Sequence, residues 1–203
     1  MSVTLTGADG TGKTTISKLI LSTVSHNSGV CLHWFRGSHL LASILARLLA
    51  GFKAFQGLCN PYYKICVPRR LRWLWVHVEL WSILPHVFTR LLLKSLCNLV
   101  VCDRGLLDFV AWLIVTLDYP EALYSLYGRF LVRLASREKP IYLYASLEVL
   151  VKRADAPRDF IARQLAVYNV LAKYLTPCRI DTGYKEPVRT LRSVLECLRE
   201  QTL

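Results

Sequence analysis

The stretch Gly7-Ala-Asp-Gly-Thr-Gly-Lys-Thr14 decides how the N-terminal part of this chain folds. It fits the pattern G-x-x-x-x-G-K-[ST] and directly follows the apolar residues 3–6. Glycines in this pattern let the backbone wrap so that successive N–H groups point at one anion. The helix expected over residues 14–25 adds the positive end of its dipole. The stretch therefore predicts a phosphate-binding loop between a buried strand and a helix.

The polar residues of this loop have distinct expected roles. Lys13 would reach the β- and γ-phosphates of a nucleotide, and the Thr14 hydroxyl would be a ligand for Mg²⁺. The chain is therefore expected to use ATP with Mg²⁺. The residues of the loop expected to bind this nucleotide are Gly7, Asp9, Gly10, Thr11, Gly12, Lys13, Thr14 and Thr15.

A carboxylate and a guanidinium follow the apolar residues 99–102. Asp103 and Arg104 would end a strand at the sheet edge from which the phosphate-binding loop also leaves. Asp103 is placed to hold Mg²⁺ or one of its waters, and Arg104 is placed to pair with a phosphate oxygen. The alternative is an ordinary ion pair at the end of a strand.

Several cations gather in residues 151–163, between two expected helices. Arg153 and Arg158 are among them, and Asp155 and Pro157 are able to start the second helix. Such a segment suits a lid that closes over phosphates and supplies charge to the transition state. A solvated basic helix start is the alternative.

Apolar runs bounded by turn residues recur along the chain at long spacing, which predicts an α/β fold. The runs alternate with stretches of helical periodicity, and no linker or repeat divides the chain, so we expect one domain over residues 1–203. About sixty residues separate the second and third strands, which is enough for two or more helices. The expected strands are 3–6, 29–35, 99–102, 140–145 and 178–181, and the expected helices are 14–25, 40–50, 71–93 and 157–175.

The charge is uneven. The 203 residues hold 26 Lys and Arg against 14 Asp and Glu, yet no acidic residue stands between Asp9 and Glu79. This basic half predicts an anionic partner and allows weak nucleic-acid binding. Within it, residues 68–81 interleave arginines with tryptophans. Leu71, Leu74, Val78 and Trp81 have the spacing of a helix packed on a core, so we expect the tryptophans mainly in the core and the arginines Arg69, Arg70 and Arg72 at a ligand.

The apolar content raises the question of a membrane. No apolar run reaches the roughly 18 to 20 residues that a spanning helix needs, and no signal peptide is evident, so a cytoplasmic protein without a membrane partner is expected. The seven cysteines are odd in number and form no C-x-x-C pair. They are therefore expected to be reduced thiols that pack as small hydrophobic side chains.

Taken together, the loop at 7–15, the pair Asp103-Arg104, the cationic segment 152–163 and Gln164-x-x-x-Tyr168 resemble the thymidylate kinases and related nucleoside monophosphate kinases. The resemblance implies a three-layer P-loop kinase fold, with a five-stranded parallel sheet of order 2-3-1-4-5, helices on both faces and a short lid. It also implies transfer of the γ-phosphoryl group of ATP to a nucleoside monophosphate. In that family pattern Asp9 would face the acceptor, Arg36 and Arg104 would hold the acceptor phosphate, and Arg153 and the turn after Asp181 would flank the adenine.

The chain departs from the family pattern in the region expected to read the acceptor base. Arg36 is followed by Gly37-Ser-His39 rather than Glu-Pro-Gly, Arg104 is followed by Gly105 rather than tyrosine, and Ile83 stands three residues before His86 where an arginine is usual. The base specificity is therefore open. The acceptor-binding helices are expected at about 37–95 and the lid at about 151–163.

The missing carboxylate after the second strand favours a nucleoside monophosphate as acceptor, because an anionic phosphate needs no general base. Two alternatives stay open. One is a kinase of a hydroxyl acceptor, either a nucleoside or a polynucleotide 5′ end, and the other is a nucleic-acid-binding ATPase. The apolar helices at 40–50 and 109–117 would also allow a homodimer.

Overall fold

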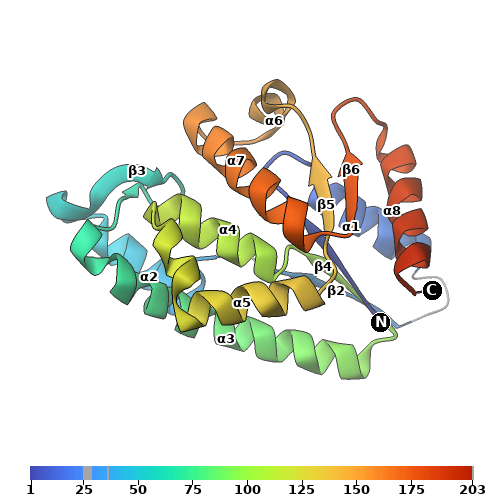
Figure 1. Ribbon diagram of the computed structural model, residues 1–203, viewed down its shortest axis with the longest axis horizontal. Helices are drawn as coiled ribbons and strands as arrows, with labels where there is room; N and C mark the ends of the chain where they lie inside the picture. Colours follow the sequence, from blue (N-terminus) through green and yellow to red (C-terminus); the bar gives the residue numbers. More distant parts are fainter. Residues whose placement is uncertain (25–28, 36, 203) are drawn as a thin grey trace.

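Five short strands form a parallel sheet in the order β2-β4-β1-β5-β6 (Figure 1). The computed structural model describes residues 1–24, 29–35 and 37–202. Because β3 lies outside this sheet, the order is the predicted 2-3-1-4-5, and the expectation of a P-loop kinase fold is confirmed. The strands are β1 (Ser2–Thr6), β2 (Val30–Trp34), β4 (Leu99–Asp103), β5 (Ile141–Tyr144) and β6 (Cys178–Asp181).

Helices cover both faces of the sheet. On one face α1 (Lys13–Val24) and α8 (Pro187–Thr202) pack on a cluster that includes Val3, Leu5 and Leu143 (Figure 1). The opposite face carries a larger apolar cluster, to which four long helices contribute most of the helical residues. These are α3 (Arg72–Leu96), α4 (Leu106–Leu117), α5 (Leu126–Arg137) and α7 (Arg158–Leu175). The three central strands β1, β4 and β5 are buried along most of their length, whereas the edge strands β2 and β6 leave several residues exposed.

The long connection between β2 and β4 begins at one end of the molecule and returns along its lower side in α3 (Figure 1). It contains α2 (Leu40–Leu49), β3 (Gln56–Asn60) and α3, so the expectation of two or more helices there is confirmed. The short β3 hairpin has no clear sequence signal and was not expected. The remaining elements are α6 (Leu147–Arg153) and three short 3₁₀ helices, η1 (Lys53–Phe55), η2 (Arg69–Leu71) and η3 (Pro120–Tyr124).

The inward face of α3 is not the one that its apolar spacing predicts. Leu71, Leu74 and Trp81 are exposed, while the buried face contains Trp75, Val76, Glu79, Ser82 and Ile83. The polar members of that face bind backbone, since Glu79 accepts from the Ser38 N–H and Ser82 Oγ accepts from the Ala42 N–H. The expected core stripe is therefore wrong, because α3 is apolar on both sides and its inward polar residues are satisfied by α2 and the loop before it.

The outward side of α3 carries Trp81, Leu84, Phe88 and Leu91, each at least half exposed. Their spacing of three and four residues places them along one line of the helix. The part of the chain that the structure describes contains no helix long and apolar enough to cross a membrane. The apolar line on α3 is thus an exposed feature of the molecule.

The cysteines also differ from expectation. The structure pairs Cys31 with Cys97, Cys59 with Cys66, and Cys178 with Cys197, and leaves Cys102 as a buried thiol. The expectation of reduced thiols throughout is wrong. Two of the pairs are separated by 66 and 19 residues, and such pairing depends on the tertiary fold rather than on local spacing.

Candidate functional site

The phosphate loop, residues 7–15, has the backbone that its glycines predict. Gly7 has φ 148° and Gly10 has φ 87°. A Cβ on Gly7 would lie 2.2 Å from the Leu143 carbonyl oxygen, and one on Gly10 would lie 2.8 Å from that of Leu150. Both positions therefore require glycine, for the backbone angle and for the close approach of the neighbouring chain.

Lys13 lies buried at the centre of this loop. Its Nζ donates to the carbonyl oxygens of Gly7 and Ala8, both at 2.7 Å, and to Thr11 Oγ1 at 3.2 Å. Burial, together with the positive charge of Arg104, lowers the pKa of Lys13 to about 8. The loop thus holds an ammonium group where a phosphate would bind, and that group titrates close to neutral pH.

Thr14 and Asp103 meet at the end of the loop, as the sequence predicts for a metal site. Thr14 Oγ1 donates to Asp103 Oδ2 at 2.6 Å. Asp103 Oδ1 is buried and has no hydrogen-bond partner among the described residues. A hydroxyl and an unsatisfied carboxylate oxygen suit Mg²⁺, which takes few protein ligands and keeps waters and phosphate oxygens as the others.

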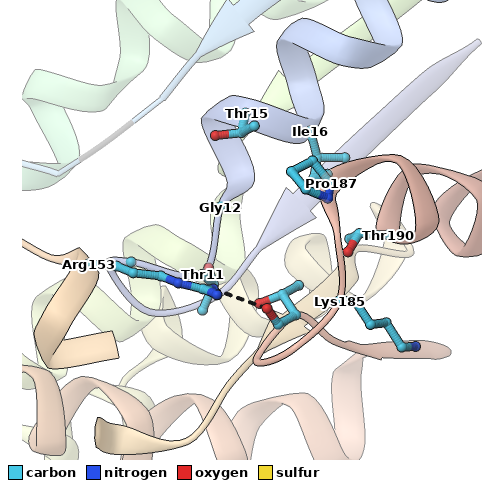
Figure 2. Close-up of a pocket in the computed structure, with 10 residues that line it drawn as sticks. Thr11, Gly12, Thr15, Ile16, Arg153, Lys185, Pro187 and Thr190 are labelled. Atoms are coloured by element: carbon cyan, nitrogen blue, oxygen red, sulfur yellow. Dashed lines mark hydrogen bonds between the residues drawn. The ribbon is translucent and has the colours of Figure 1, made fainter. Parts of the chain in front are cut away.

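A first pocket of about 280 Å³ opens on one side of the loop (Figure 2). Arg153 reaches across it from the end of α6 and donates to the carbonyl oxygens of Thr182 at 3.0 Å and Gly183 at 2.9 Å. Arg153 therefore ties α6 to the turn after β6. The pocket is lined by Gly10, Thr11, Gly12, Thr15, Ile16, Arg153, Thr182, Lys185, Pro187 and Thr190.

Three predicted site residues lie elsewhere. Arg158 is exposed and pairs with Glu148 at 3.7 Å, so it does not line the first pocket. Asp181 accepts from the Gly183 N–H at 2.8 Å, and it shapes the turn while Thr182 and Lys185 line the pocket. Arg36 lies outside the described residues.

Asp9 and Arg104 form an ion pair on the other side of the loop. Arg104 Nη2 lies 2.5 Å from Asp9 Oδ1, while Asp9 Oδ2 accepts from the Tyr62 hydroxyl at 2.5 Å and from Gln164 Nε2 at 3.2 Å. Burial opposes the charge of Asp9, but Arg104, Lys13 and the Tyr62 hydroxyl outweigh it and hold the pKa of that carboxyl well below its usual range. Asp9 is therefore a fixed anion.

Arg104 is held in an unusual backbone conformation, with φ 82°. Its carbonyl oxygen accepts from Arg90 Nη2 at 2.9 Å, and Arg90 pairs with Glu138 at 2.6 Å. Glu138 in turn accepts from the Leu106 N–H at 2.9 Å. A Cβ on Gly105 would lie 2.4 Å from Glu138 Oε2, which explains why glycine follows Arg104 where the family has tyrosine. This buried pair positions the turn that presents Arg104.

Asp108 joins the loop to α4 and α7, a role the sequence reasoning missed. Its Oδ1 accepts from the Tyr168 hydroxyl at 2.7 Å and from the Gly7 N–H at 3.3 Å, and its Oδ2 accepts from the Gly105 N–H at 2.8 Å. The available signal is a single acid within the otherwise apolar helix at 106–117. Such a residue is rarely buried without partners.

A second buried carboxylate, Glu79, supports the loop after β2. It accepts from the Ser38 N–H at 2.6 Å, from the Ser38 hydroxyl and from Trp75 Nε1 at 3.2 Å. Trp112 Nε1 donates to Ser38 Oγ at 3.0 Å. Burial raises the pKa of Glu79. Ser38, with φ 55°, is thus fixed from two helices.

A second pocket lies between Asp9 and these supports. Its volume is about 10 Å³, room for about one water. Gly37 borders it so closely that a Cβ there would lie 1.9 Å from the Trp112 ring. The lining residues are Asp9, Gly37, Arg104, Asp108, Ala111, Trp112, Gln164 and Tyr168. Of these, Trp112 carries no motif that would have identified it.

Comparison with known proteins rests on structure. No protein-family model and no curated protein sequence matches the chain. The thymidylate kinase from Candida albicans superimposes with a TM-score of 0.60 at 15% identity, over 99% of this chain and 92% of that one. The chain has the thymidylate kinase fold. The deoxyadenosine kinase from M. mycoides, solved with bound dCTP, superimposes with a TM-score of 0.57 at 14% identity, over 98% and 100% of the two chains.

In this example of the thymidylate kinase fold the phosphate loop separates the two pockets. Gly10, Thr11 and Gly12 line the first, whereas Asp9 lines the second. Lys13 lies between them and feels the charges of both Asp9 and Asp103. One loop therefore contacts both pockets.

Proposed function

We propose that the protein is a Mg²⁺- and ATP-dependent kinase that transfers a phosphoryl group to a nucleoside monophosphate. The observation that carries this proposal is the phosphate loop with one pocket on each side. ATP in the first pocket and an acceptor in the second would bring the reacting groups together at Lys13. The thymidylate kinase fold supports the class of reaction, and nucleotide biosynthesis is the natural setting for it.

On the side of the phosphate donor, residues of the chain would supply positive charge and orient the phosphates of ATP. Lys13 and Arg153 would neutralise the phosphates, while the backbone of residues 7–15 would bind them through N–H groups. Bound Mg²⁺, held by Thr14 and Asp103, would neutralise phosphate oxygens. In the proposal residues 151–163 are the lid, and Arg158 would approach the phosphates only when that lid closes.

On the acceptor side the buried carboxylates argue for a phosphate rather than a hydroxyl acceptor. Asp9 is paired with Arg104, Asp108 is bonded to Tyr168 and two backbone N–H groups, and Asp103 lies at the metal site. A hydroxyl acceptor would usually require a carboxylate base with a raised pKa, whereas the pKa of Asp9 is lowered. A phosphate acceptor is already anionic and would bind Arg104 and Arg36. Residues 37–95 would form its site.

The runner-up function is a kinase of a hydroxyl acceptor. The likeness to a deoxyadenosine kinase favours it, because the name of that enzyme describes a nucleoside substrate. A polynucleotide acceptor, or an ATPase that binds nucleic acid, would instead use exposed cations of the basic half such as Lys53, Lys64, Arg69 and Arg70. Arg72 is committed to Asp118 and is unsuited to that role.

A substrate panel separates these functions. The protein would receive ATP and Mg²⁺ with each common nucleoside monophosphate, each nucleoside, a 5′-hydroxyl oligonucleotide or no acceptor, and ADP release would be measured. We expect ADP only with monophosphates. ADP with nucleosides or with the oligonucleotide alone would establish the runner-up, and acceptor-independent ADP stimulated by nucleic acid would establish the ATPase.

The exposed line on α3 supports a homodimer as part of this proposal, whereas the expected helix at 109–117 is almost wholly buried and is unsuited to one. Trp81, Leu84, Phe88 and Leu91 repeat at the spacing of a helix-packing seam, and the same surface would face itself across a two-fold axis. Phe88→Glu should convert a dimer to a monomer in light scattering, with Thr89→Glu on the same exposed helix as the matched control. A wild-type protein that is monomeric at all concentrations would refute the dimer.

We infer a cytoplasmic location from the proposed use of ATP and Mg²⁺. Three disulfides are uncommon in a reducing cytosol, although intracellular proteins of hyperthermophiles are rich in them. The location and the disulfides are therefore compatible in such a cell. Counting free thiols in protein that is alkylated at the moment of lysis tests this: one thiol per chain supports three disulfides, and seven refutes them.

A further inference from the structure

The β3 hairpin reaches over the second pocket. Its two arms are joined where the Gly57 N–H donates to the Lys64 carbonyl oxygen at 3.2 Å and the Cys66 N–H donates to that of Phe55 at 2.7 Å. The disulfide between Cys59 and Cys66 closes it covalently. The hairpin is thus a small braced unit rather than a loose loop.

Two neighbouring tyrosines at the hairpin tip bind Asp9, which lines the second pocket, and Ser38, which follows the lining residue Gly37. Tyr62 donates to Asp9 Oδ2 at 2.5 Å, and Tyr63 donates to the Ser38 carbonyl oxygen at 3.0 Å. The Tyr62 ring lies 5.9 Å from the ring of Trp112 and 5.9 Å from that of Phe160, measured between centroids. The Tyr62 side chain therefore lies against Asp9 and Trp112, two of the residues that line a pocket with room for one water.

The outer side of the hairpin has space. A cavity of about 410 Å³ separates Leu58, Cys59 and Cys66 from the start of α7, where Pro157 and Arg163 line it. The arms of the hairpin are nevertheless anchored, because Ile65 is 2% exposed and belongs to the core cluster, and Asn60 is also buried. Exchange of the contacts made by Tyr62 would therefore move the tip of the hairpin and leave its arms, the sheet and the core in place.

We propose that Tyr62 is the latch of an acceptor-side gate, in which the tip of the β3 hairpin closes the second pocket and the acceptor must displace Tyr62 from Asp9 to enter. This proposal rests on the proposed kinase function for the identity of the entering molecule, a nucleoside monophosphate. The acceptor would take over the contacts that Tyr62 makes with Asp9 and the Trp112 ring. The disulfide and the buried Ile65 hold the two arms in place, so the gate opens by movement of Tyr62 at the tip.

The first test measures the cover itself and needs no substrate. Trp112 is 6% exposed. In Tyr62→Ala the fraction of tryptophan fluorescence that acrylamide quenches should rise, and this rise should vanish when the same change is made in a Trp112→Phe background. Tyr174→Ala, at an exposed tyrosine on α7, is the matched control. An unchanged quenchable fraction in Tyr62→Ala overturns the proposal.

The second test measures the latch. Tyr62→Phe keeps the ring and removes the hydroxyl that binds Asp9. Because loss of a hydrogen bond to a charged group would raise the open population roughly tenfold, the KM for the monophosphate should fall by roughly tenfold. The KM for ATP and kcat should change less than twofold, as in the control Tyr174→Phe.

The third test measures the brace. Replacing Cys59 and Cys66 together with serine should raise the quenchable fraction and lower the acceptor KM, whereas replacing Cys178 and Cys197 should do neither. Equal acceptor KM in wild type and Tyr62→Phe overturns the latch. A wild type that phosphorylates no monophosphate, but shows the expected quenching, overturns the proposed function and leaves the cover in place.

Discussion

The two sides of the phosphate loop are built differently. The first pocket is open, about 280 Å³, and combines the consecutive residues Gly10, Thr11 and Gly12 with Arg153 and the turn after β6. On the other side the pocket is about 10 Å³, and its walls come from segments far apart in the chain: Gln164 and Asp9 are 155 residues apart, and Tyr62 and Asp9 are 53 apart. A local motif supplies one wall of the first pocket, whereas long-range contacts to Asp9 shape and close the second.

The largest effect should come from the shared residue of the loop. Lys13→Ala removes the ammonium group between the two sites, and kcat/KM should fall by about 10³, the size typical for loss of a group that stabilises transition-state charge. ADP release with ATP and the acceptor measures it. Lys18→Ala, exposed on the same helix, should retain wild-type rates. A Lys13→Ala rate within tenfold of wild type would exclude the proposed role.

Arg104→Ala should affect only the second site. The change removes the partner of Asp9, so the acceptor KM should rise by about 100-fold, comparable to the loss of one buried charge pair. ATP binding, measured by calorimetry, should stay within about threefold of wild type and shows that the variant is folded. Arg137→Ala on the surface is the control. Equal losses of ATP and acceptor binding would show that the two sites are not separable.

Glu79→Gln tests the long-range construction of the second site. The amide has one acceptor oxygen, so one of the three donors from Ser38 and Trp75 is left without a partner. The free energy of unfolding should fall by about 2 kcal/mol, about thirtyfold in the unfolding constant. Urea denaturation measures it, with exposed Glu196→Gln as control. An unchanged midpoint would mean that Ser38 is positioned without Glu79.

The smallest expected effect is a pH dependence of the Kd for ATP. With a pKa of about 8, free Lys13 loses its proton as the pH rises, whereas bound phosphates favour the protonated form. The Kd for ATP should therefore rise about tenfold between pH 7 and pH 9. Lys13→Ala should bind ATP weakly and show no such rise. A wild-type Kd that is constant over this range would contradict the buried environment of Lys13.

Local sequence was a good guide where contacts are local. The strand order, the loop glycines and the meeting of Thr14 with Asp103 follow from the motif and from the alternation of apolar runs. The same reasoning identified Arg153 but also favoured Arg158, which lies exposed beside Glu148. A run of cations indicates a basic segment without showing which side chain turns inward.

Sequence was a poor guide where a residue depends on a distant partner. Leu74 and Trp81 have core spacing, yet α3 turns its other side inward because Glu79 and Ser82 bind the backbone near α2. The cysteine pairs and the position of Tyr62 have the same origin. Each depends on which segments the fold brings together, and one sequence does not carry that information in a local pattern.

The disulfide between Cys31 and Cys97 determines how the protein responds to a cut in the chain or to a change in its length. It joins β2 to the residue that follows α3, so both ends of the segment holding α2, the hairpin and α3 are fastened at one point beside the sheet. A protease that cuts once inside this segment would leave two fragments joined by the disulfide. They would migrate as one band in denaturing gel electrophoresis until a reductant is added. Insertions and deletions between the two cysteines would likewise change the length of the enclosed segment, whereas Cys31 and Cys97 would keep their positions beside the sheet.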